Sequence, residues 1–311
     1  MYESRETVAL IDCASYAPDR LEKAMASLAE VVPLGQSQHG KVVLLKPNLI
    51  SSLGNPLSCT HPNFIGAVAA WYKNHGARVI VGDSPAFGSA AGVCDKFGVT
   101  EILRKIDVEI VNFHTAVRRK LAGGITVPIA RCAMECDLFV GLPKIKAHNQ
   151  MFVSLAMKNI FGIVTGMSKA MLHMVHGSNH QQFAEIILAL QTVLPPQMHI
   201  ADGIEVMHRT GPLHGDLLAL NCLGASASPV ALDVAIHALL ELDPGKSPLL
   251  LAAAARGDWQ CRADRLHFPL ERPQRYHSSG FVAPNELNPV RFNPFRFLRG
   301  FGRRCLLKLG L

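Results

Sequence analysis

The chain has 311 residues, of which 49% are hydrophobic and 18% charged, enough to bury a large core in one domain or in two lobes around a cleft. No run of about 18 apolar residues occurs and the polar start lacks a signal-peptide pattern, so we expect a cytoplasmic protein without a transmembrane helix. Of the net charge of +7, +6 lies after residue 266, where eight basic residues face two acidic ones, and the near-neutral body argues against nucleic acid as a partner.

Short apolar runs alternate with segments of helical spacing along the chain. In chain order we predict a strand at 6–13, a helix at 18–32, a strand at 41–49, a helix at 61–75, a strand at 78–85, helices at 89–97 and 100–106, and strands at 108–113, 125–130 and 138–142. A helix at 181–194, strands at 198–204 and 217–223, and helices at 229–242 and 248–256 follow. This order predicts an α/β fold with a mostly parallel sheet and helices on both faces.

We place the α/β domain at residues 1–266 and treat residues 267–311 as a basic, aromatic appendage, because regular periodicity fades there. The eight cysteines are scattered, and no C-x2-C run of an iron–sulfur or zinc site is present. No G-x-G-x-x-G or G-x-x-x-x-G-K-[ST] motif follows a predicted strand, which disfavours dinucleotide and P-loop sites. The cofactor is therefore left unassigned.

Four predicted strands end in polar residues together with Pro or Gly. Because parallel strands align their carboxyl ends, we expect these residues to converge in one cleft. They are Lys46 and Asn48, then Asp83 and Ser84, then Lys144, Lys146 and His148, and finally Asp202, with Lys158 and Asn159 close behind the third strand where the next helix begins. Each group alone is also typical of the turn that follows an ordinary strand. The lysines are also typical of a basic loop exposed to solvent.

Lysines at such a place need an anionic partner, because an unpaired buried charge is costly. The cluster therefore predicts a small anionic ligand, a carboxylate or a phosphate. We take Lys46, Asn48, Asp83, Ser84, Lys146, Lys158, Asn159 and Asp202 as the substrate-binding candidates. His148, Lys144 and His176 are the catalytic candidates, because a histidine or a lysine of lowered pKa could move a proton.

Three histidines, His173, His176 and His180, have spacings that would also suit a metal site on one helical face. Gly177 and the residues after it read as a break, so helical geometry holds only for the first two. We expect this stretch to be a mobile loop over the cleft, with His176 as the acid–base group, and we assign no metal.

Several of these motifs also occur together in a known family. They are Lys46-Pro47-Asn48-Leu49, Gly82-Asp83-Ser84-Pro85, Leu142-Pro143-Lys144-x-Lys146-x-His148, Met157-Lys158-Asn159-x-Phe161-Gly162, Asp202-Gly203-Ile204, Gly211-Pro212 and Pro229-Val230-Ala231-Leu232-Asp233. In this order and spacing, residues 40–260 resemble the domain-of-unknown-function 362 family, whose members are prokaryotic and often carry a fused ferredoxin-like module. This chain lacks that module, so the resemblance implies a separate iron–sulfur electron-transfer partner for any cluster-based role. By layout alone, the chain is more distantly similar to the N-terminal half of nickel-dependent lactate racemase.

Two functions remain open. The first is an enzyme, an isomerase or an oxidoreductase, that carries out proton-transfer or redox chemistry on a small anionic molecule. The second is a non-catalytic binding or assembly protein that docks to a membrane surface or a redox partner through its tail. Residues 291–311 interleave Phe and Leu with six basic residues and no acid, which suits peripheral contact with an anionic membrane. Packing of the same Phe and Leu residues on the body is the alternative.

Overall fold

A computed structural model describes residues 5–34, 38–177 and 179–290 of the chain. Within these residues, nine strands form one central sheet. Its main path runs in the order β10 (Phe152–Ser154), β9 (Lys144–His148), β11 (Gln197–His208), β8 (Leu138–Leu142), β3 (Val42–Pro47), β4 (Arg78–Asp83) and β5 (Glu109–Asn112). Two further strands continue from β11, first β12 (Asp216–Ser226) and then β2 (Ala9–Asp12).

The pairings of the central sheet are mostly parallel. From β9 to β5 each described strand is parallel to its neighbour. The β10–β9, β11–β12 and β12–β2 pairs are antiparallel. Together with the helices on both faces, this arrangement confirms the α/β class expected from the sequence.

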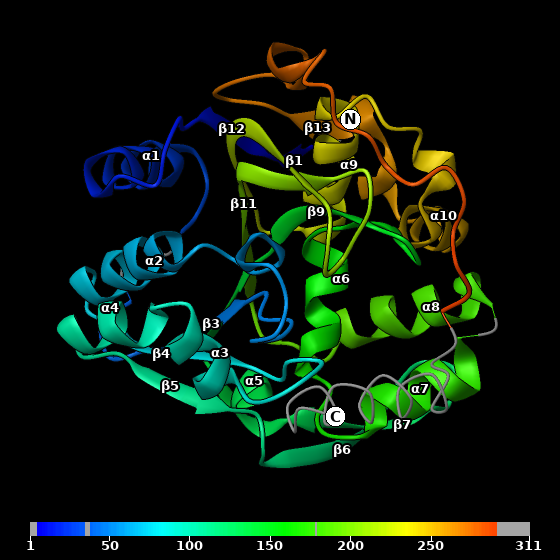
Figure 1. The fold of residues 1–311 in the computed structure, drawn as a ribbon, viewed down its shortest axis with the longest axis horizontal. Coiled ribbons are helices and arrows are strands. Elements are labelled where there is room, and N and C mark those ends of the chain that lie inside the picture. The colour runs from blue at the N-terminus through cyan, green and yellow to red at the C-terminus, as the bar shows by residue number, and fades with distance from the viewer. Residues whose placement is uncertain (1–4, 35–37, 178, 291–311) are drawn as a thin grey trace, which may run out of the picture.

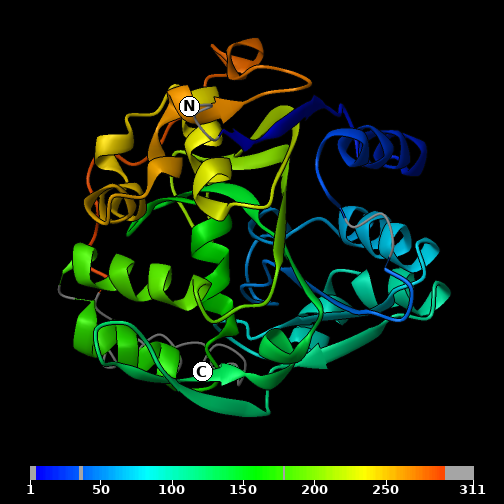
Figure 2. The ribbon, with the colours of Figure 1, turned by 180° about the vertical axis from the view of Figure 1, so that it is seen from behind.

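Helices cover the two faces of the sheet in separate groups (Figures 1 and 2). On β3, Val43 and Leu45 pack into one core, whereas Leu44 packs into the other. Alternate residues of a strand face opposite sides, so a continuous apolar run suits a strand that is covered twice. The first core contains α1 (Pro18–Val31), α2 (Pro62–Asn74), α3 (Ala90–Lys96) and α4 (Val99–Lys105). The second contains α6 (Ala156–Ile160), α8 (His180–Gln191), α9 (Pro229–Leu239) and α10 (Pro248–Ala255).

All the helices predicted from periodicity are present, with ends that differ by a few residues. α1 and α2 each have a proline in the first turn, where its missing N–H costs no hydrogen bond. The sequence did not predict α5 (Arg131–Glu135) or the hairpin of β6 (Ala116–Lys120) and β7 (Thr126–Ala130), of which only the second strand was expected. The strand expected at 6–13 is divided into β1 (Glu6–Thr7), which pairs with β13 (Leu266–His267), and β2. In the described residues, no helix is both long and apolar enough to cross a membrane.

Two expectations about the central motif are wrong. The stretch after Pro143 is not a loop that leads into a helix but the strand β9, which continues along β11 after β8 ends. Pro143 has no N–H, and its carbonyl accepts a hydrogen bond from the Asp202 amide at 2.8 Å, so the chain keeps β11 as neighbour while it leaves β3. Asp202 therefore lies inside β11, which runs on to His208, rather than at a strand end.

The expected loop over the cleft is also wrong, because residues 168–176 form α7 (Ser168–His176). The break after it is confirmed, since α8 begins at His180 with Asn179 as its cap. His173 and His176 thus share one short helix, and His180 starts the next.

Residues 267–290 lie against the body. The amide of Glu271 donates to the Leu10 carbonyl at 3.1 Å, and the amide of Asn288 donates to the Asn149 carbonyl at 2.6 Å. Tyr276 and Val290 are both buried in the second core. The rest of the predicted appendage, residues 291–311, lies outside the described residues.

Candidate functional site

The ends of β3 and β4 bring two charged residues together in the interior. Lys46 and Asp83 are adjacent because the strands are parallel neighbours, and Lys46 Nζ lies 2.8 Å from Asp83 Oδ1. Asp83 also accepts the backbone amides of Leu49 at 2.9 Å and Ser84 at 2.8 Å. Burial lowers the pKa of Lys46, while the Asp83 charge raises it. The carboxylate therefore holds the two loops that follow the strands and balances the Lys46 charge.

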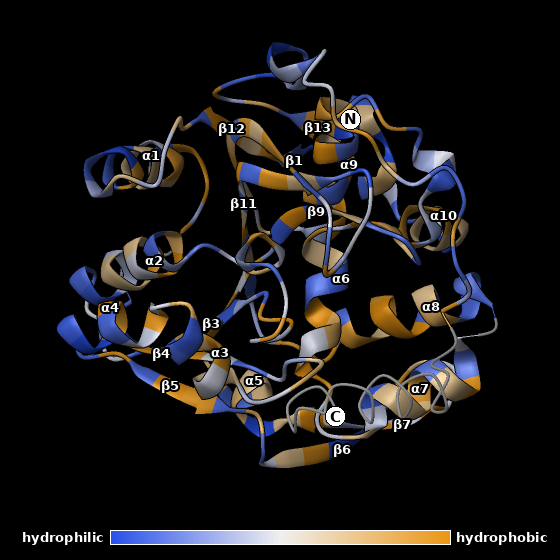
Figure 3. Ribbon diagram, viewed as in Figure 1, coloured by the Kyte–Doolittle hydropathy of each residue, from blue (hydrophilic) through white to orange (hydrophobic). Residues whose placement is uncertain are grey.

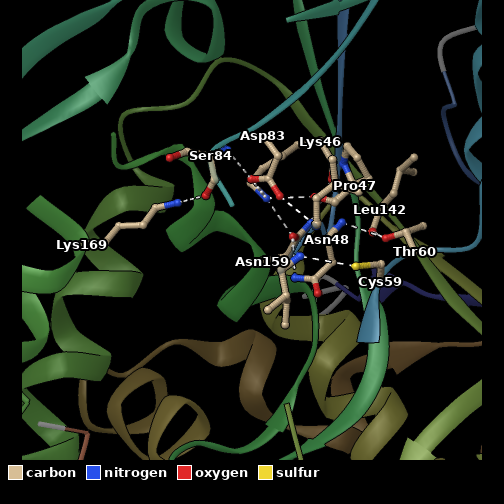
Figure 4. A network of polar contacts seen from close by, with 12 residues as sticks. Lys46, Pro47, Asn48, Cys59, Thr60, Asp83, Ser84, Leu142, Asn159 and Lys169 are labelled. Atoms are coloured by element: carbon tan, nitrogen blue, oxygen red, sulfur yellow. Dashed lines mark hydrogen bonds and ion pairs between the residues drawn. The ribbon is translucent and has the colours of Figure 1, made fainter. Parts of the chain in front are cut away.

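Asn159 connects this ion pair to the rest of the cluster (Figure 4). Its Oδ1 accepts from Lys46 Nζ at 3.0 Å and from Asn48 Nδ2 at 3.3 Å, and its Nδ2 donates to the Lys46 carbonyl at 3.0 Å. Asn159 lies on α6, whose first amides, those of Ala156 and Met157, donate to buried Asp233. Burial raises the pKa of Asp233 well above its usual value, and its side chain satisfies two amides of α6 that have no partner within the helix, so Asp233 fixes the position of α6.

A glycine makes room for the ion pair. A Cβ added at Gly162 would lie 2.2 Å from Lys46 Cε and 2.6 Å from Asp83 Oδ1. Gly162 belongs to the Lys-Asn-x-x-Gly motif that begins at Lys158. The motif thus combines the side-chain amide of Asn159, which binds Lys46, with the backbone of Gly162, which approaches Lys46 closely.

Lys146 extends the cluster from β9. Its ammonium contacts Asn48 Oδ1 and the Ser58 carbonyl, both neutral oxygens. Burial, reinforced by the charges of Lys158 and Lys144, lowers the pKa of Lys146 to about 7. The group is therefore only partly protonated near neutral pH.

A second network surrounds Lys144. Lys144 Nζ lies 2.9 Å from Asp202 Oδ2 and 2.8 Å from the Tyr16 hydroxyl, which in turn donates to Asp202 Oδ1 at 2.7 Å. The His61 amide donates to Asp202 Oδ2 at 2.9 Å, and the His61 ring stacks on Tyr16 with centroids 3.5 Å apart. Burial and the Asp202 charge raise the pKa of Tyr16. Lys144 is thus fully paired inside the protein, and no sequence pattern indicated Tyr16 or His61 as its companions.

Two further lysines adjoin the first network. Lys158 Nζ lies 4.8 Å from the centre of the Phe161 ring, and burial lowers the pKa of this lysine to about 8. Lys169, on α7, donates to the Ser84 carbonyl, and burial lowers its pKa to about 7. Sequence reasoning missed Lys169, because it lies outside the motifs and reaches the site only through the packing of α7.

The histidines lie at unequal distances from this cluster. His148 shares the face of β9 with Lys144 and Lys146, and its Nδ1 accepts the Gln150 amide at 3.1 Å. Burial and the charges of Lys158 and Lys146 hold the pKa of His148 well below its usual value, so it is neutral. His173 is likewise kept neutral, with a pKa of about 4 that burial causes. Among the described residues no polar contact joins His176 to the cluster.

The balance of charge is uneven across the site. Of the buried ion pairs in the described part of the chain, one joins Lys46 to Asp83 and the other Lys144 to Asp202. Within the same described part, Lys146, Lys158 and Lys169 have no carboxylate partner. We call these three residues the unpaired lysines. Lys146 is fully buried, whereas Lys158 and Lys169 are half-buried. Removal from water lowers the pKa of all three, so a bound anion would stabilise their ammonium forms.

Comparisons with known proteins agree with the pattern of motifs. The family described as Domain of unknown function (DUF362) matches residues 43–238. A thylakoid-associated protein of Synechocystis sp. is 34% identical over 300 residues, covering 94% of this chain and 92% of that protein.

Two solved structures share a more distant likeness. The lactate racemase apoprotein of Thermoanaerobacterium thermosaccharolyticum has 15% identity and a TM-score of 0.47, covering 73% of this chain and 57% of that one. A crystal structure of a Thermotoga maritima protein has 12% identity and a TM-score of 0.44, covering 67% of this chain and 56% of that one. The present chain thus spans little more than half of either structure.

Proposed function

This chain belongs to the family of domain of unknown function 362, and we propose that it is an enzyme that binds a small carboxylate or phosphate at the unpaired lysines and transfers a proton there. The observation that carries the proposal is the balance of charge. Three lysines without a carboxylate partner lie near Lys46, whose charge Asp83 already balances. Isolated ammonium groups are costly to bury, and an anion would offset that cost.

The lowered lysine pKa values support catalysis over binding alone. A general acid or base is most effective when its pKa is near the working pH, and Lys146, at about 7, meets that condition. Asn48 and Asn159 would orient the anion, and neutral His148 would accept or donate a hydrogen bond. Lys46 and Lys144 would contribute positive potential from their ion pairs rather than a free proton.

Binding of the anion is tested first. Small molecules released from natively purified protein are identified by mass spectrometry, and titration calorimetry with inorganic phosphate measures affinity directly. We expect Lys146→Met and Lys169→Met to weaken binding by about 1–3 kcal/mol each, the cost of a lost charged hydrogen bond. Lys105→Met on α4, where Lys105 is exposed and paired with Glu101, is the matched control. Equal affinity in all three variants would remove the unpaired lysines from the site.

Proton transfer needs a separate test. The released molecule is incubated with the protein in D2O, and NMR follows exchange of its carbon-bound hydrogens. We expect exchange that Lys146→Met abolishes. Binding without exchange would favour the second candidate, a non-catalytic binding protein.

We also propose peripheral association with an anionic membrane through residues 291–311. The basic and aromatic composition of that segment supports it, and so does the name of the cyanobacterial relative, which is thylakoid-associated. An iron–sulfur protein as redox partner remains a proposal that rests on the family resemblance alone.

A further inference from the structure

One face of α7 is apolar and exposed. Met167, at the cap, is 84% exposed, Met171 60%, Met174 47% and Val175 62%. Positions i, i+4, i+7 and i+8 lie on one side of a helix, so these four side chains form a stripe, the α7 stripe. In Figure 3 the ribbon of α7, at the edge of the molecule, carries apolar colours interrupted by hydrophilic ones, as expected for a helix with one apolar face. A contiguous exposed apolar surface on a short helix calls for a partner.

The other face of the same helix is anchored in the protein. Leu172 is buried, and the His173 ring packs edge-on against Phe161 and lies 4.5 Å from the Phe183 ring, centroid to centroid. Lys169 reaches the Ser84 carbonyl. The α7 stripe is therefore held outward by contacts on the opposite side, rather than exposed by an ill-fitting helix.

A hairpin with one basic strand contacts the segment just before α7. The β6–β7 hairpin reaches this segment through a bridge between Ile129 and Val164 and through the Thr165 amide, which donates to the Pro128 carbonyl at 3.1 Å. Its strand β6 carries three consecutive cations, Arg118, Arg119 and Lys120, all on an exposed strand. None of the ion pairs found between described residues involves these three side chains.

The described part of the chain ends at the same helix. His173 Nδ1 donates to the carbonyl of Val290 at 3.1 Å, and Val290 is the last residue that the structure describes. Residues 291–311 contain six basic groups and no acid, and residues 138–184, which include α7, also contain no acid. Segments of the same charge sign repel, so charge opposes the tail as a cover for α7 and favours one anionic surface that contacts both.

We propose that the α7 stripe, together with the basic residues of the adjoining β6–β7 hairpin, docks on an anionic lipid surface, with the Met and Val side chains at the level of the headgroups. A helix of this kind lies in the membrane interface, and nearby Lys and Arg residues strengthen its attraction to anionic lipid. Methionine suits this contact because its flexible side chain adapts to an irregular apolar surface. The α7 stripe would thus be the surface for the proposed membrane association, on the face of α7 opposite the one that carries Lys169.

The test uses the full chain and vesicles of equimolar phosphatidylglycerol and phosphatidylcholine at low salt, with phosphatidylcholine alone for comparison. Met171→Glu/Val175→Glu should weaken sedimentation with the anionic vesicles by roughly tenfold or more, because it places two charges at the contact. Leu217→Glu, at a residue of β12 that is 56% exposed, is the matched control and should bind like the wild type. Circular dichroism melting curves should be unchanged in both variants, because all three side chains are exposed.

A second measurement reports on contact directly. In a Met174→Trp variant, brominated phosphatidylglycerol should quench tryptophan fluorescence, whereas it should not quench the added tryptophan of Leu217→Trp. Vesicle binding that the α7 double variant leaves intact would overturn the inference and leave the tail as the sole contact, with membrane association itself preserved. Failure of the wild-type chain to bind vesicles would overturn both. Emission at position 174 that is blue-shifted before lipid is added would show that the tail or a second copy covers α7, which also contradicts the inference.

Discussion

Lys146 shows how strongly position decides chemistry at the scale of a residue. In an unfolded chain its pKa would be near 10.4, whereas burial beside neutral oxygens lowers it to about 7. Lys169 has a pKa of about 7 and Lys158 of about 8 for the same reason. Three groups that are ordinarily permanent cations therefore titrate near neutral pH.

Anion affinity should follow these titrations. An anion favours the ammonium forms, so the dissociation constant for phosphate should rise as pH increases from 6 to 9, through the pKa values of about 7 and 8. Binding near pH 8 should also take up protons. Calorimetry in buffers of different ionisation enthalpy measures that uptake, and a pH-independent affinity for phosphate would contradict the assignment.

Stability should change with pH in the same region. Between about pH 7 and 10 the unfolded chain binds a proton at Lys146 that the folded chain does not, so the free energy of unfolding rises with pH there by up to about 1.4 kcal/mol per unit. Lys158 and Lys169 contribute to the total slope in the same way, so Lys146→Met should lower the slope by the contribution of one lysine, which urea unfolding at several pH values measures. Lys105→Met should keep it, since Lys105 is exposed on α4. A wild-type slope that persists in Lys146→Met would show that Lys146 titrates normally.

Gly162→Ala tests the close approach of the Gly162 backbone to Lys46. The added methyl group would overlap Lys46 and Asp83, so we expect a loss of about 1–3 kcal/mol in the free energy of unfolding, as for other overpacked sites. Gly92→Ala in α3 is the control, because its Cβ would meet only Ser89 Oγ at 3.2 Å, and helix propensity favours alanine. Equal melting temperatures in the two variants would mean that the ion pair yields to the methyl group at little cost.

The residues of the cluster were largely predictable, but their partners were not. Lysines that follow apolar runs indicate the ends of strands in the sequence. For this reason Lys46, Lys146 and Lys158 were among the residues predicted to bind the anion. Tyr16 and Lys169 come from a loop and a helix without such a pattern. Only the folded chain brings them close, because each depends on the packing of an element far away in the sequence.

At the scale of elements, the alternation of strands and helices could be predicted but the path after Pro143 could not. Lys144 to His148 alternates polar and apolar residues, a pattern typical of a strand with one side in water. In the protein this side is buried against other polar groups, so β9 is an internal strand. The alternation of polar and apolar residues indicates that one face of the strand is polar. It does not indicate whether that face meets water or other buried polar groups.

Asp233 connects α9 to α6 and offers a test at this scale. It accepts the amides of Ala156 and Met157, so Asp233→Leu should lower the free energy of unfolding by about 1–3 kcal/mol by leaving buried donors without a partner. Phosphate affinity should fall as well, because α6 carries Lys158 and Asn159. Asp243→Leu removes a comparable contact, to the Gly245 amide, at an exposed site and should cost less without affecting phosphate. Unchanged phosphate binding in folded Asp233→Leu would separate α6 from the site.

At the scale of the molecule, residues 267–290 contribute to the second core despite their irregular sequence. Their backbone hydrogen bonds reach two elements that are far apart in the sequence, β2 at Leu10 and the turn after β9 at Asn149, and Val290 is only 1% exposed. Periodicity could not reveal this, since these residues pack through single side chains rather than through a regular element.

Truncation measures that contribution. A chain that ends at residue 290 should keep the wild-type melting temperature, whereas one that ends at residue 266 should melt well below it, because Tyr276 and Val290 leave the second core. Differential scanning calorimetry compares the two. Equal melting temperatures would show that residues 1–266 fold into a domain that does not depend on residues 267–290.

One helix also links the anion site to the surface proposed for lipid. α7 offers Lys169 to the anion site on one side and its Met and Val side chains to the outside on the other, over nine residues. A lipid surface that restrained this helix would also restrain Lys169, and an anion that held Lys169 would also restrain the stripe. Linkage requires such an effect to be reciprocal, so a given factor gained in anion affinity on the membrane equals the factor gained in membrane affinity with the anion bound. The protein would then respond to two signals at once. Its anion site and its membrane surface would both be occupied most fully where the lipid surface and the small molecule are present together.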